Sequence, residues 1–364
     1  MDFALSAEQE ALRRSVQAML DKESSLARVR EVCLEGDGVA ADLWRILAQE
    51  YGLVGLALPE DLGGAGASLV EVAVVQEQLG YHLTPVPYLS TVLAATLLAR
   101  HAADDTTREV VRQSAEGDTI LTCATSPDRV QVTVEGTSTQ KVVTGEIGLV
   151  LEGHVADAVL ITAEVDGSPA LVLVHLEEGT TRRERLDGLD LTRAVVDLHL
   201  IQATATVVAS MDTRAEVRRT AAILLAAEQA GVARAALDMS TAYARTREQF
   251  GRPIGSYQAI KHRCADMFVS TESAWSTAFY AAWSVEGDPG QVEEAAVVAR
   301  AVCSEGARSA TAACIQVHGG IGFTWEHDAH LLARRAKGSA LLLGDPRGDL
   351  DDLAGSLLAR AEGA

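Results

Sequence analysis

The hydrophobic period of this chain changes twice, and the two changes predict three consecutive folding units. Residues 1 to about 117 repeat apolar side chains at a spacing of three to four residues, which is typical of helices. Around residue 118 the spacing becomes two, as in the segment 130–134 with the sequence VQVTV. From about residue 213 the helical period returns. The sequence therefore predicts an α+β fold with a helical domain (1–117), a β domain (118–212) and long C-terminal helices (213–364).

Within these units the periodicity predicts individual elements. Ser6 is expected to cap a first helix, because Gln9 follows three residues later and apolar residues then recur at helical spacing. A loop rich in glycine, Gly63-Gly64-Ala65-Gly66, favours a turn between two helices. The other expected helices are 41–47, 68–79, 91–103, 217–247, 257–283, 293–317 and 350–359, and the expected strands are 130–134, 149–151, 158–162, 170–175 and 195–199.

The charge balance restricts the class of partner. The chain has 51 Asp and Glu residues against 31 Lys and Arg residues, a formal net charge of −20. Because nucleic acids need a basic surface, we expect no nucleic-acid partner, and any polyanionic ligand must be held by locally placed arginines. The five cysteines form no CxxC pair, the segment from Met1 to Ser6 is no export signal, and charges interrupt the apolar runs. We therefore expect a cytoplasmic protein without a membrane span.

The common motifs of enzyme sites are absent from the sequence. No GxGxxG follows a predicted strand, and there is no P-loop, GxSxG or HExxH. His318, His327 and His330 lie close to Glu326 and Asp328, but their spacing matches no common ligand set on a helix face. We therefore expect no metal site.

Two segments suggest anion binding, although neither is specific alone. Residues 243–255, with the sequence YARTREQFGRPIG, end the long helix with arginines and then break it with glycine and proline. Residues 316–323, with the sequence QVHGGIGF, run from a helix end into a glycine turn that can present backbone N–H groups to an anion.

In this order, after a small β domain, the two segments resemble the acyl-CoA dehydrogenase family over the whole chain. Further similar segments are Pro59–Gly66 (PExxGGxG), Gln78-Leu79-Gly80, Tyr257–His262 and Arg335-Ala336-Lys337. The resemblance implies an N-terminal helical domain, a middle antiparallel β domain and a C-terminal four-helix bundle, assembled as a dimer or tetramer. It also implies FAD chemistry, in which a Glu takes the α-proton of an acyl-CoA thioester and the β-hydrogen leaves as hydride to the flavin.

This chain departs from the family pattern at the positions of that Glu. The common position corresponds to Leu343, and the alternative position on the long helix corresponds to Ala221, so neither can accept a proton. Asp345, Glu326 and Asp328 are the nearby acids that could substitute. The strand that meets the flavin in the family corresponds to Leu149–Glu152, with the sequence LVLE, whose leucine and valine side chains offer the flavin edge no hydrogen bonds.

The positions that the family uses on the flavin of a neighbouring subunit are retained. By resemblance the FAD-binding residues are Arg247, Gln249, Phe250, Gln316, Gly319 and Gly320. The pattern is similar to the partner subunit of heteromeric α2β2 actinobacterial enzymes that act on CoA-linked steroid side chains. We therefore predict no catalytic residue in this chain, and a homologous subunit that carries the Glu and binds the acyl-CoA.

Other interpretations stay open at the level of the sequence. The retained segments could be bundle architecture in a protein that binds no flavin, such as a non-redox assembly protein. The chain could also be a stand-alone flavoenzyme with a displaced base such as Asp345. Arg334, Arg335 and Lys337 could bind a CoA phosphate, but we favour surface solvation or ion pairing within the bundle for them.

Overall fold

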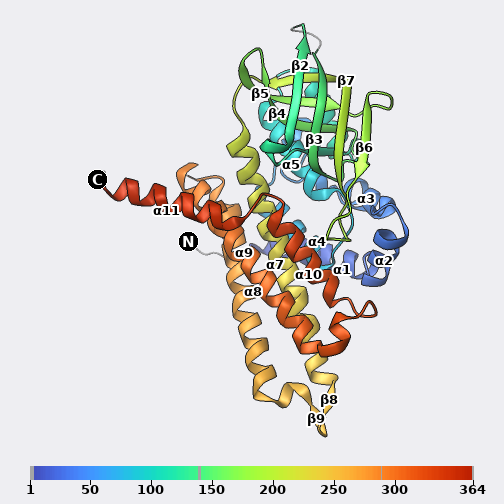
Figure 1. Cartoon of the computed structure of the whole chain (residues 1–364), viewed down its shortest axis with the longest axis vertical. Helices are drawn as coiled ribbons and strands as arrows, with labels where there is room; N and C mark the ends of the chain where they lie inside the picture. The colour runs from blue at the N-terminus through green and yellow to red at the C-terminus, as the bar shows by residue number, and fades with distance from the viewer. Residues whose placement is uncertain (1–3, 138–140, 288, 363–364) are drawn as a thin grey trace.

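A computed structural model describes residues 4–137, 141–287 and 289–362 of the chain. We expect no export signal in the segment from Met1 to Ser6, and its first three residues (Met1, Asp2 and Phe3) lie outside the described residues. The β domain lies at one end of the molecule, and three long helices extend from it to the opposite end (Figure 1). The predicted α+β arrangement of helices, sheet and helices is confirmed.

The N-terminal domain is helical, and side-chain hydrogen bonds at the N-caps stabilise the starts of some of its helices. The Ser6 hydroxyl accepts a hydrogen bond from the Gln9 amide at 3.2 Å, and Ser68 caps a later helix in the same way. Gly64 packs so closely on Leu58 that a Cβ there would lie 2.0 Å from the Leu58 carbonyl oxygen, so the glycine loop is a tight structural turn. The helices are α1 (Ala7–Glu23), α2 (Leu26–Arg30), α3 (Ala41–Arg45), α4 (Leu69–Tyr81), α5 (Tyr88–His101) and α6 (Asp105–Ala115).

The β domain is one twisted sheet whose strands are mostly antiparallel. The strands are β1 (Leu121–Cys123), β2 (Val130–Gly136), β3 (Lys141–Leu151), β4 (Ala158–Val165), β5 (Ser168–His175), β6 (Thr181–Arg185) and β7 (Val195–Ala209). Their order is β1-β4-β5-β7-β3-β2, with β6 also paired to β7. Only β1 runs parallel to its neighbour, with Leu121 opposite Ala158. The periodicity missed β1 and β6, because one has three residues and the other carries mostly charged side chains.

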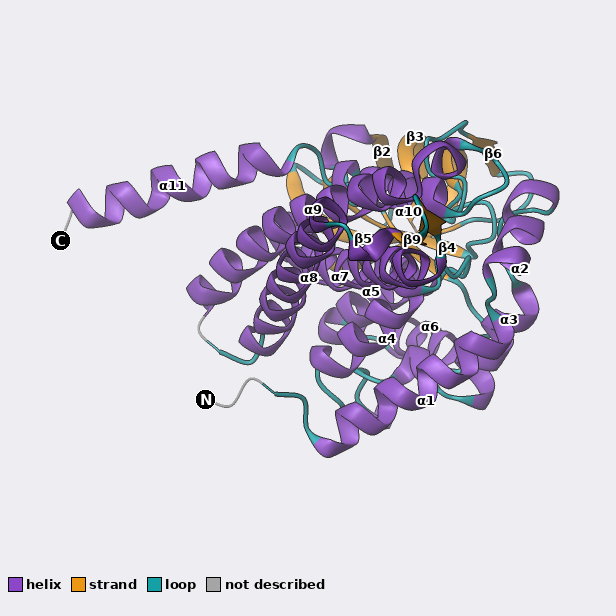
Figure 2. Ribbon diagram, turned by 90° about the horizontal axis from the view of Figure 1, so that it is seen from below, coloured by secondary structure: helices purple, strands orange, loops and turns teal. Residues whose placement is uncertain are grey.

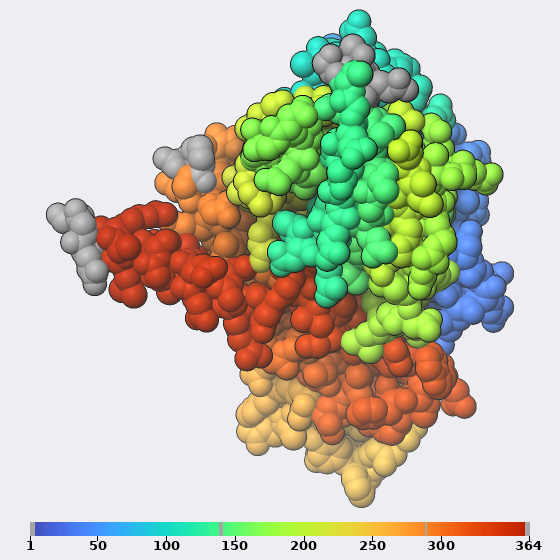
Figure 3. Space-filling model, turned by 45° about the horizontal axis from the view of Figure 1, so that its top comes forward, coloured from blue at the N-terminus to red at the C-terminus, as the bar shows by residue number. Residues whose placement is uncertain are grey.

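The C-terminal helices pack around α7 (Arg214–Thr246), which is buried over most of its length. The others are α8 (Gln258–Ser284), α9 (Pro289–His318), α10 (Ala329–Leu341) and α11 (Pro346–Glu362). The sequence pattern missed α10, whose apolar positions are interrupted by Arg334, Arg335 and Lys337. The α11 helix projects from the body of the molecule as an arm (Figures 2 and 3).

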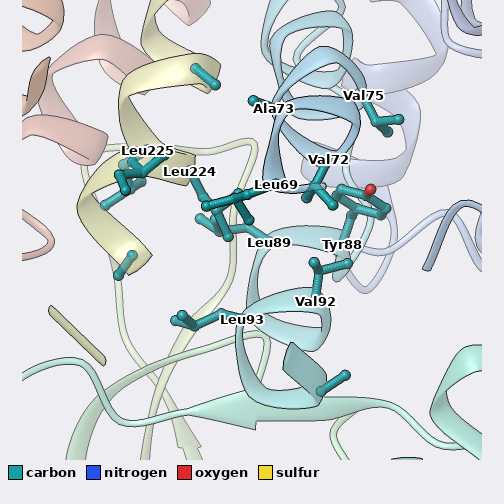
Figure 4. Packing of buried hydrophobic residues seen from close by; sticks show 14 of the residues in the cluster. Leu69, Val72, Ala73, Val75, Tyr88, Leu89, Val92, Leu93, Leu224 and Leu225 are labelled. Carbon is teal, nitrogen blue, oxygen red and sulfur yellow. The ribbon is translucent and has the colours of Figure 1, made fainter. Parts of the chain in front are cut away.

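One large apolar core joins the N-terminal domain to the bundle. Figure 4 shows Leu69 and Val72 of α4, Leu89 and Val92 of α5, and Leu224 of α7 packed side by side. The α7 helix is long and apolar enough to cross a membrane by composition, but 94% of its most apolar window is buried inside the protein. The hydrophobicity of α7 is therefore accounted for by burial in this core.

Candidate functional site

The two segments that suggested anion binding meet at one end of the bundle. Helix α7 ends at Thr246, and Arg247 caps it, with its amide donating to the Tyr243 carbonyl at 2.8 Å. Helix α9 ends beside it at His318, whose ring stacks on Tyr243 with the ring centroids 4.3 Å apart. The buried side chains of Ala244 and Val317, one from each helix, belong to the same small apolar cluster. The fold therefore brings residues 70 positions apart into one site.

A short hairpin extends this site away from the helix ends. Strands β8 (Glu248–Gln249) and β9 (Arg252–Pro253) pair antiparallel, and the turn between them is Phe250-Gly251. Both turn residues have positive φ, +54° for Phe250 and +77° for Gly251, the pattern of a type I′ turn. Phe250 is 92% exposed at the tip, so the hairpin presents an aromatic ring to its surroundings at the far end from the β domain (Figure 1).

This end of the bundle concentrates cations in an otherwise acidic protein. Residues 243–263 contain one acidic residue, Glu248, against five basic residues: Arg245, Arg247, Arg252, Lys261 and Arg263. In the part of the chain that the structure describes, none of these five side chains forms an ion pair. A basic surface of this kind can hold a phosphorylated ligand that the net charge of the chain would otherwise repel.

The glycine turn lies beside these cations. Gly319 has a φ of +65° and opens the 3-10 turn η7 (Gly319–Phe323), and a Cβ at Gly319 or Gly320 would meet no atom within 4 Å. Gln316 is exposed one turn before the end of α9. The open face of the turn and the amide side chain can approach a phosphate group closely.

The histidines near this turn form a stack of rings. His318 Nδ1 lies 2.8 Å from the Cys314 carbonyl oxygen, which can only accept, so this nitrogen carries the proton and donates it. The His327 ring lies 4.3 Å from the His318 ring between centroids. Burial lowers the pKa of His318 and His327, which favours neutral rings. Among the described residues no group of three or more His, Cys, Asp or Glu side chains is arranged to hold a metal ion.

The two candidate positions for a catalytic base lie in another part of the bundle and are apolar. Leu343 is 3% exposed and Ala221 is 2% exposed, and both belong to the large core. Twenty-six residues separate Ala221 from Arg247 along the continuous helix α7. At 1.5 Å per residue the Ala221 and Arg247 positions are about 39 Å apart. The Ala221 position and the bundle-end site therefore lie at well-separated points of the same helix.

The acids that could replace a base have other partners. Asp345 is exposed and accepts a hydrogen bond from the Arg347 amide at 3.0 Å, which starts helix α11. Asp328 accepts from Arg30 at 2.5 Å across the contact between α2 and α10. Neither carboxylate faces the Leu343 position in a buried site, so the geometry favours structural roles for both.

The strand segment Leu149–Glu152 carries one polar side chain, that of Glu152, which is 6% exposed. Leu149 lies at a bulge with a φ of +58°, and its amide donates to Asp197 at 2.9 Å. The nearby Thr122 hydroxyl donates to the Leu151 carbonyl at 2.7 Å, and Ser126 donates to the Leu342 carbonyl at 3.4 Å. The Thr122 and Ser126 hydroxyls are therefore engaged within the protein. The side chains of Leu149, Val150 and Leu151 offer no hydrogen bonds, which does not fit the binding of an isoalloxazine edge.

Behind this segment, a buried network of charges that the sequence did not reveal joins the β domain to the bundle. Gln76 of the N-terminal domain also donates a hydrogen bond to Glu228 of this network at 3.0 Å. Arg335 of α10 contacts Asp190 at 2.9 Å and Glu228 of α7 at 3.4 Å. Arg193 pairs with Glu228 and lies 3.6 Å from Glu152. The single acid Glu228 within the apolar run 220–233 was the available signal. Because Arg335 is 3% exposed and fully paired, it is an ion-pairing residue of the core and does not serve a CoA phosphate.

We call the buried charges of Glu152, Asp190, Arg193, Glu228 and Arg335 the ionic core. Among them, Glu152 is weakly paired. Three acids (Asp190, Glu152 and Glu228) face two arginines, and Glu152 Oε2 has no hydrogen-bond partner among the described residues. Burial raises the pKa of Glu152 to about 7, whereas the two arginines hold the pKa of Glu228 below its usual range. The ionic core therefore binds a proton near neutral pH.

We expect Glu152→Gln to stabilise the protein at pH 8. Since the folded-state pKa of Glu152 lies above the unfolded value of 4.5, its stabilising contribution is present below about pH 4.5 and is lost as the pH rises through 7. The neutral amide avoids that loss, so the free energy of unfolding at pH 8 should rise by roughly 2 kcal/mol. Urea denaturation at pH 5.5 and pH 8 measures the difference. Glu228→Gln is the control and should destabilise at both values, and a Glu152→Gln protein that is less stable at pH 8 would contradict the assignment.

The helical domain, the β domain and the long C-terminal helices define a class of fold: a three-domain scaffold with a basic surface at one end of its helical bundle. Residues 6–118 match the family profile "Acyl-CoA dehydrogenase, N-terminal domain", and residues 208–354 match "Acyl-CoA dehydrogenase, C-terminal domain". The chain is 36% identical to "Acyl-CoA dehydrogenase IpdE2" of Mycolicibacterium smegmatis over 346 residues, 95% of this chain and 97% of that protein. It therefore belongs to the acyl-CoA dehydrogenase family.

Solved structures of heteromeric relatives are similar over nearly the whole chain. The ChsE4-ChsE5 complex from Mycobacterium tuberculosis contains a chain with a TM-score of 0.90 and 32% identity, covering 98% of this chain and 99% of that one. A chain of the Tcur3481-Tcur3483 steroid acyl-CoA dehydrogenase (G363A variant) has a TM-score of 0.88 and 29% identity, covering 98% and 99%. The family resemblance inferred from the sequence is thereby confirmed.

Proposed function

We propose that this chain is the non-catalytic subunit of a heteromeric acyl-CoA dehydrogenase and completes the FAD site of its partner. The observation that carries the proposal is the apolar burial of both base positions, Leu343 at 3% and Ala221 at 2% exposure. The bundle end, in contrast, keeps exposed cations and an open glycine turn. One end of the chain thus fits part of a dinucleotide that must belong to another subunit.

In this proposal the FAD-binding residues make different kinds of contact with FAD. Arg247 offers a planar cationic fork to the diphosphate, and the Gly319-Gly320 turn offers backbone N–H groups. Gln249 and Gln316 supply amide hydrogen bonds, and Phe250 supplies an aromatic face. When bound, FAD accepts the hydride in the 2,3-desaturation of an acyl-CoA. The Glu that takes the α-proton, and the acyl-CoA itself, belong to the partner subunit.

The relatives support the partner and suggest the substrate class. The Tcur3481-Tcur3483 structure is titled a steroid acyl-CoA dehydrogenase, and both structures combine two different chains. We propose a homologous partner, a steroid side-chain CoA substrate, an α2β2 assembly and a cytoplasmic location. The competing interpretations are a stand-alone flavoenzyme, which the exposed Asp345 does not favour, and a non-redox assembly protein.

A flavin count per chain tests the proposal. The chain is purified alone and with the partner that copurifies from its native host, and FAD is released and quantified in each preparation. We expect no FAD in the chain alone and one FAD per pair of different chains in the complex. One FAD per chain with turnover in the isolated protein would support the stand-alone enzyme, and a complex without FAD would support the assembly protein.

We expect Leu343→Glu to create no measurable dehydrogenase activity in the isolated chain. The substitution restores a carboxylate at the family position, but the strand at the flavin position carries leucine and valine side chains, and Leu343 is buried in the apolar core. A buried unpaired carboxylate should also lower the stability by several kcal/mol. An acyl-CoA dehydrogenation assay with added FAD measures the activity, with Leu343→Gln as the control. Turnover in the glutamate variant alone would show that the cleft still accepts flavin.

A further inference from the structure

Tyr257 occupies the base of the hairpin that carries Gln249 and Phe250. The Tyr257 side chain is half-buried, at the junction between the 3-10 turn η6 (Ile254–Ser256) and helix α8. Its hydroxyl donates a hydrogen bond to the Gln249 carbonyl at 3.0 Å. The base of the hairpin also closes on the helix end, since the Ile254 amide donates to the Arg247 carbonyl at 2.8 Å.

The same tyrosine ring contacts both other sides of the hairpin. The Arg252 guanidinium lies over the ring, with its Cζ 4.1 Å from the ring centroid. The Phe250 ring meets it edge-on, with the centroids 6.4 Å apart and an interplanar angle of 85°. Each geometry is favourable, the first as a cation–π contact and the second as an edge-to-face pair. One side chain therefore contacts three of the four residues of the hairpin tip.

The hairpin needs such support because its conformation is strained. A left-handed backbone at Phe250 is unfavourable for an L-residue with a large side chain, whereas asparagine or glycine is usual at this turn position. Phe250 is also 92% exposed, so contacts within this chain do not bury the ring and do not offset the backbone strain. A strained, exposed aromatic residue held by its neighbours is a common feature of binding sites.

We propose that Tyr257 is a positioning residue that holds the β8–β9 hairpin in its ligand-binding conformation before the partner and FAD arrive. This inference rests on the proposed function. It also divides the basic residues of the bundle end into two groups. The Arg252 guanidinium packs on the Tyr257 ring and supports the hairpin, whereas the Arg247 guanidinium remains available to bind the diphosphate.

The test replaces Tyr257 by Phe, which removes only the hydroxyl group, and by Leu, which also removes the ring. Two quantities are measured: amide hydrogen exchange of residues 247–256 in the isolated full chain, and the FAD dissociation rate from the copurified complex. We expect faster exchange in both variants, and an FAD dissociation rate raised about fivefold to tenfold by Tyr257→Phe and further by Tyr257→Leu. At saturating FAD the turnover number should stay unchanged, because Tyr257 does not touch the reacting atoms.

The controls separate this inference from the proposed function. Tyr51→Phe, in the N-terminal domain, should leave both quantities unchanged, and Arg252→Gln should follow Tyr257→Phe. If exchange and the FAD dissociation rate are unaltered in both Tyr257 variants while Arg247→Ala releases FAD, the positioning role is wrong and the proposed function stands. If Arg247→Ala retains FAD, the proposed function fails, and hydrogen exchange alone then decides whether Tyr257 orders the hairpin.

Discussion

Replacing Arg247 by Ala should release FAD from the heteromeric complex. We expect the dissociation constant for FAD to rise about 100-fold, because a charged side chain that contacts a diphosphate is among the most costly to truncate. Arg247 is exposed at the end of α7 and forms no ion pair in the described part of the chain, so its removal should leave the fold of the isolated chain intact. Flavin absorbance after gel filtration, with the FAD:protein ratio of each fraction, measures the loss.

Two variants serve as controls for charge and for geometry. Arg245→Ala removes the same charge two residues earlier on the helix, and it should raise the dissociation constant for FAD far less. Arg247→Lys keeps the charge but loses the planar fork, so we expect an intermediate increase of about tenfold. If Arg247→Ala and Arg245→Ala weaken FAD binding equally, FAD binding depends on the total positive charge of the bundle end and not on a specific contact between Arg247 and the diphosphate. An unchanged FAD content in the Arg247→Ala complex would count against binding in trans.

Replacing Arg335 by Met should destabilise the protein by about 3–5 kcal/mol. The methionine keeps most of the side-chain volume, but Asp190 and Glu228 lose a buried counter-ion and the hydrogen bonds from Arg335 to Thr192 are lost. Breaking a buried ion pair on one side is costly because the remaining charges stay desolvated. The midpoint of urea denaturation, followed by tryptophan fluorescence at pH 7, measures the change.

The adjacent residue provides a matched control. Arg334 is only half-buried, with one hydrogen bond to the Leu189 carbonyl and its guanidinium over the Trp325 ring, so Arg334→Met should cost about 1 kcal/mol or less. Because Arg335 and Glu228 are in contact, the double variant with Glu228→Gln should cost less than the sum of the two single changes. A cost below about 1 kcal/mol for Arg335→Met would mean that the ionic core is not needed to hold the three domains together.

The ionic core joins the β domain, through Glu152 and Arg193, to the bundle, through Glu228 and Arg335. Leu151 and Leu343 belong to the apolar core. Making room for a flavin ring among these residues would expose apolar surface and separate buried charges. This packing agrees with the non-catalytic role that we propose for the chain.

Most elements followed from the hydrophobic period, and the exceptions have physical causes. Helix α7 was predicted as 217–247 and lies at 214–246, because a long alanine-rich run has no competing signal. Strand β6 and helix α10 were missed because charged side chains interrupt their periodicity. In α10 the interruption is Arg335, which is buried only because Asp190 and Glu228 lie opposite. No local pattern can indicate a partner 107 residues away.

The sequence alone determined the helix–sheet–helix order, the family, and the apolar residues at Leu343 and Ala221, since period and residue type are local properties. It also named Arg247 and Gln316 as ligand-binding positions, although their role remains a prediction. Only the tertiary structure decided that these two lie together at one end of the bundle and that Leu343 is buried in the apolar core. It likewise decided that Glu228, Arg335 and Arg193 form one ionic core. Which residues come together depends on which helix faces pack against each other. The stabilising contacts form between residues of different segments, so no single segment of the sequence specifies them.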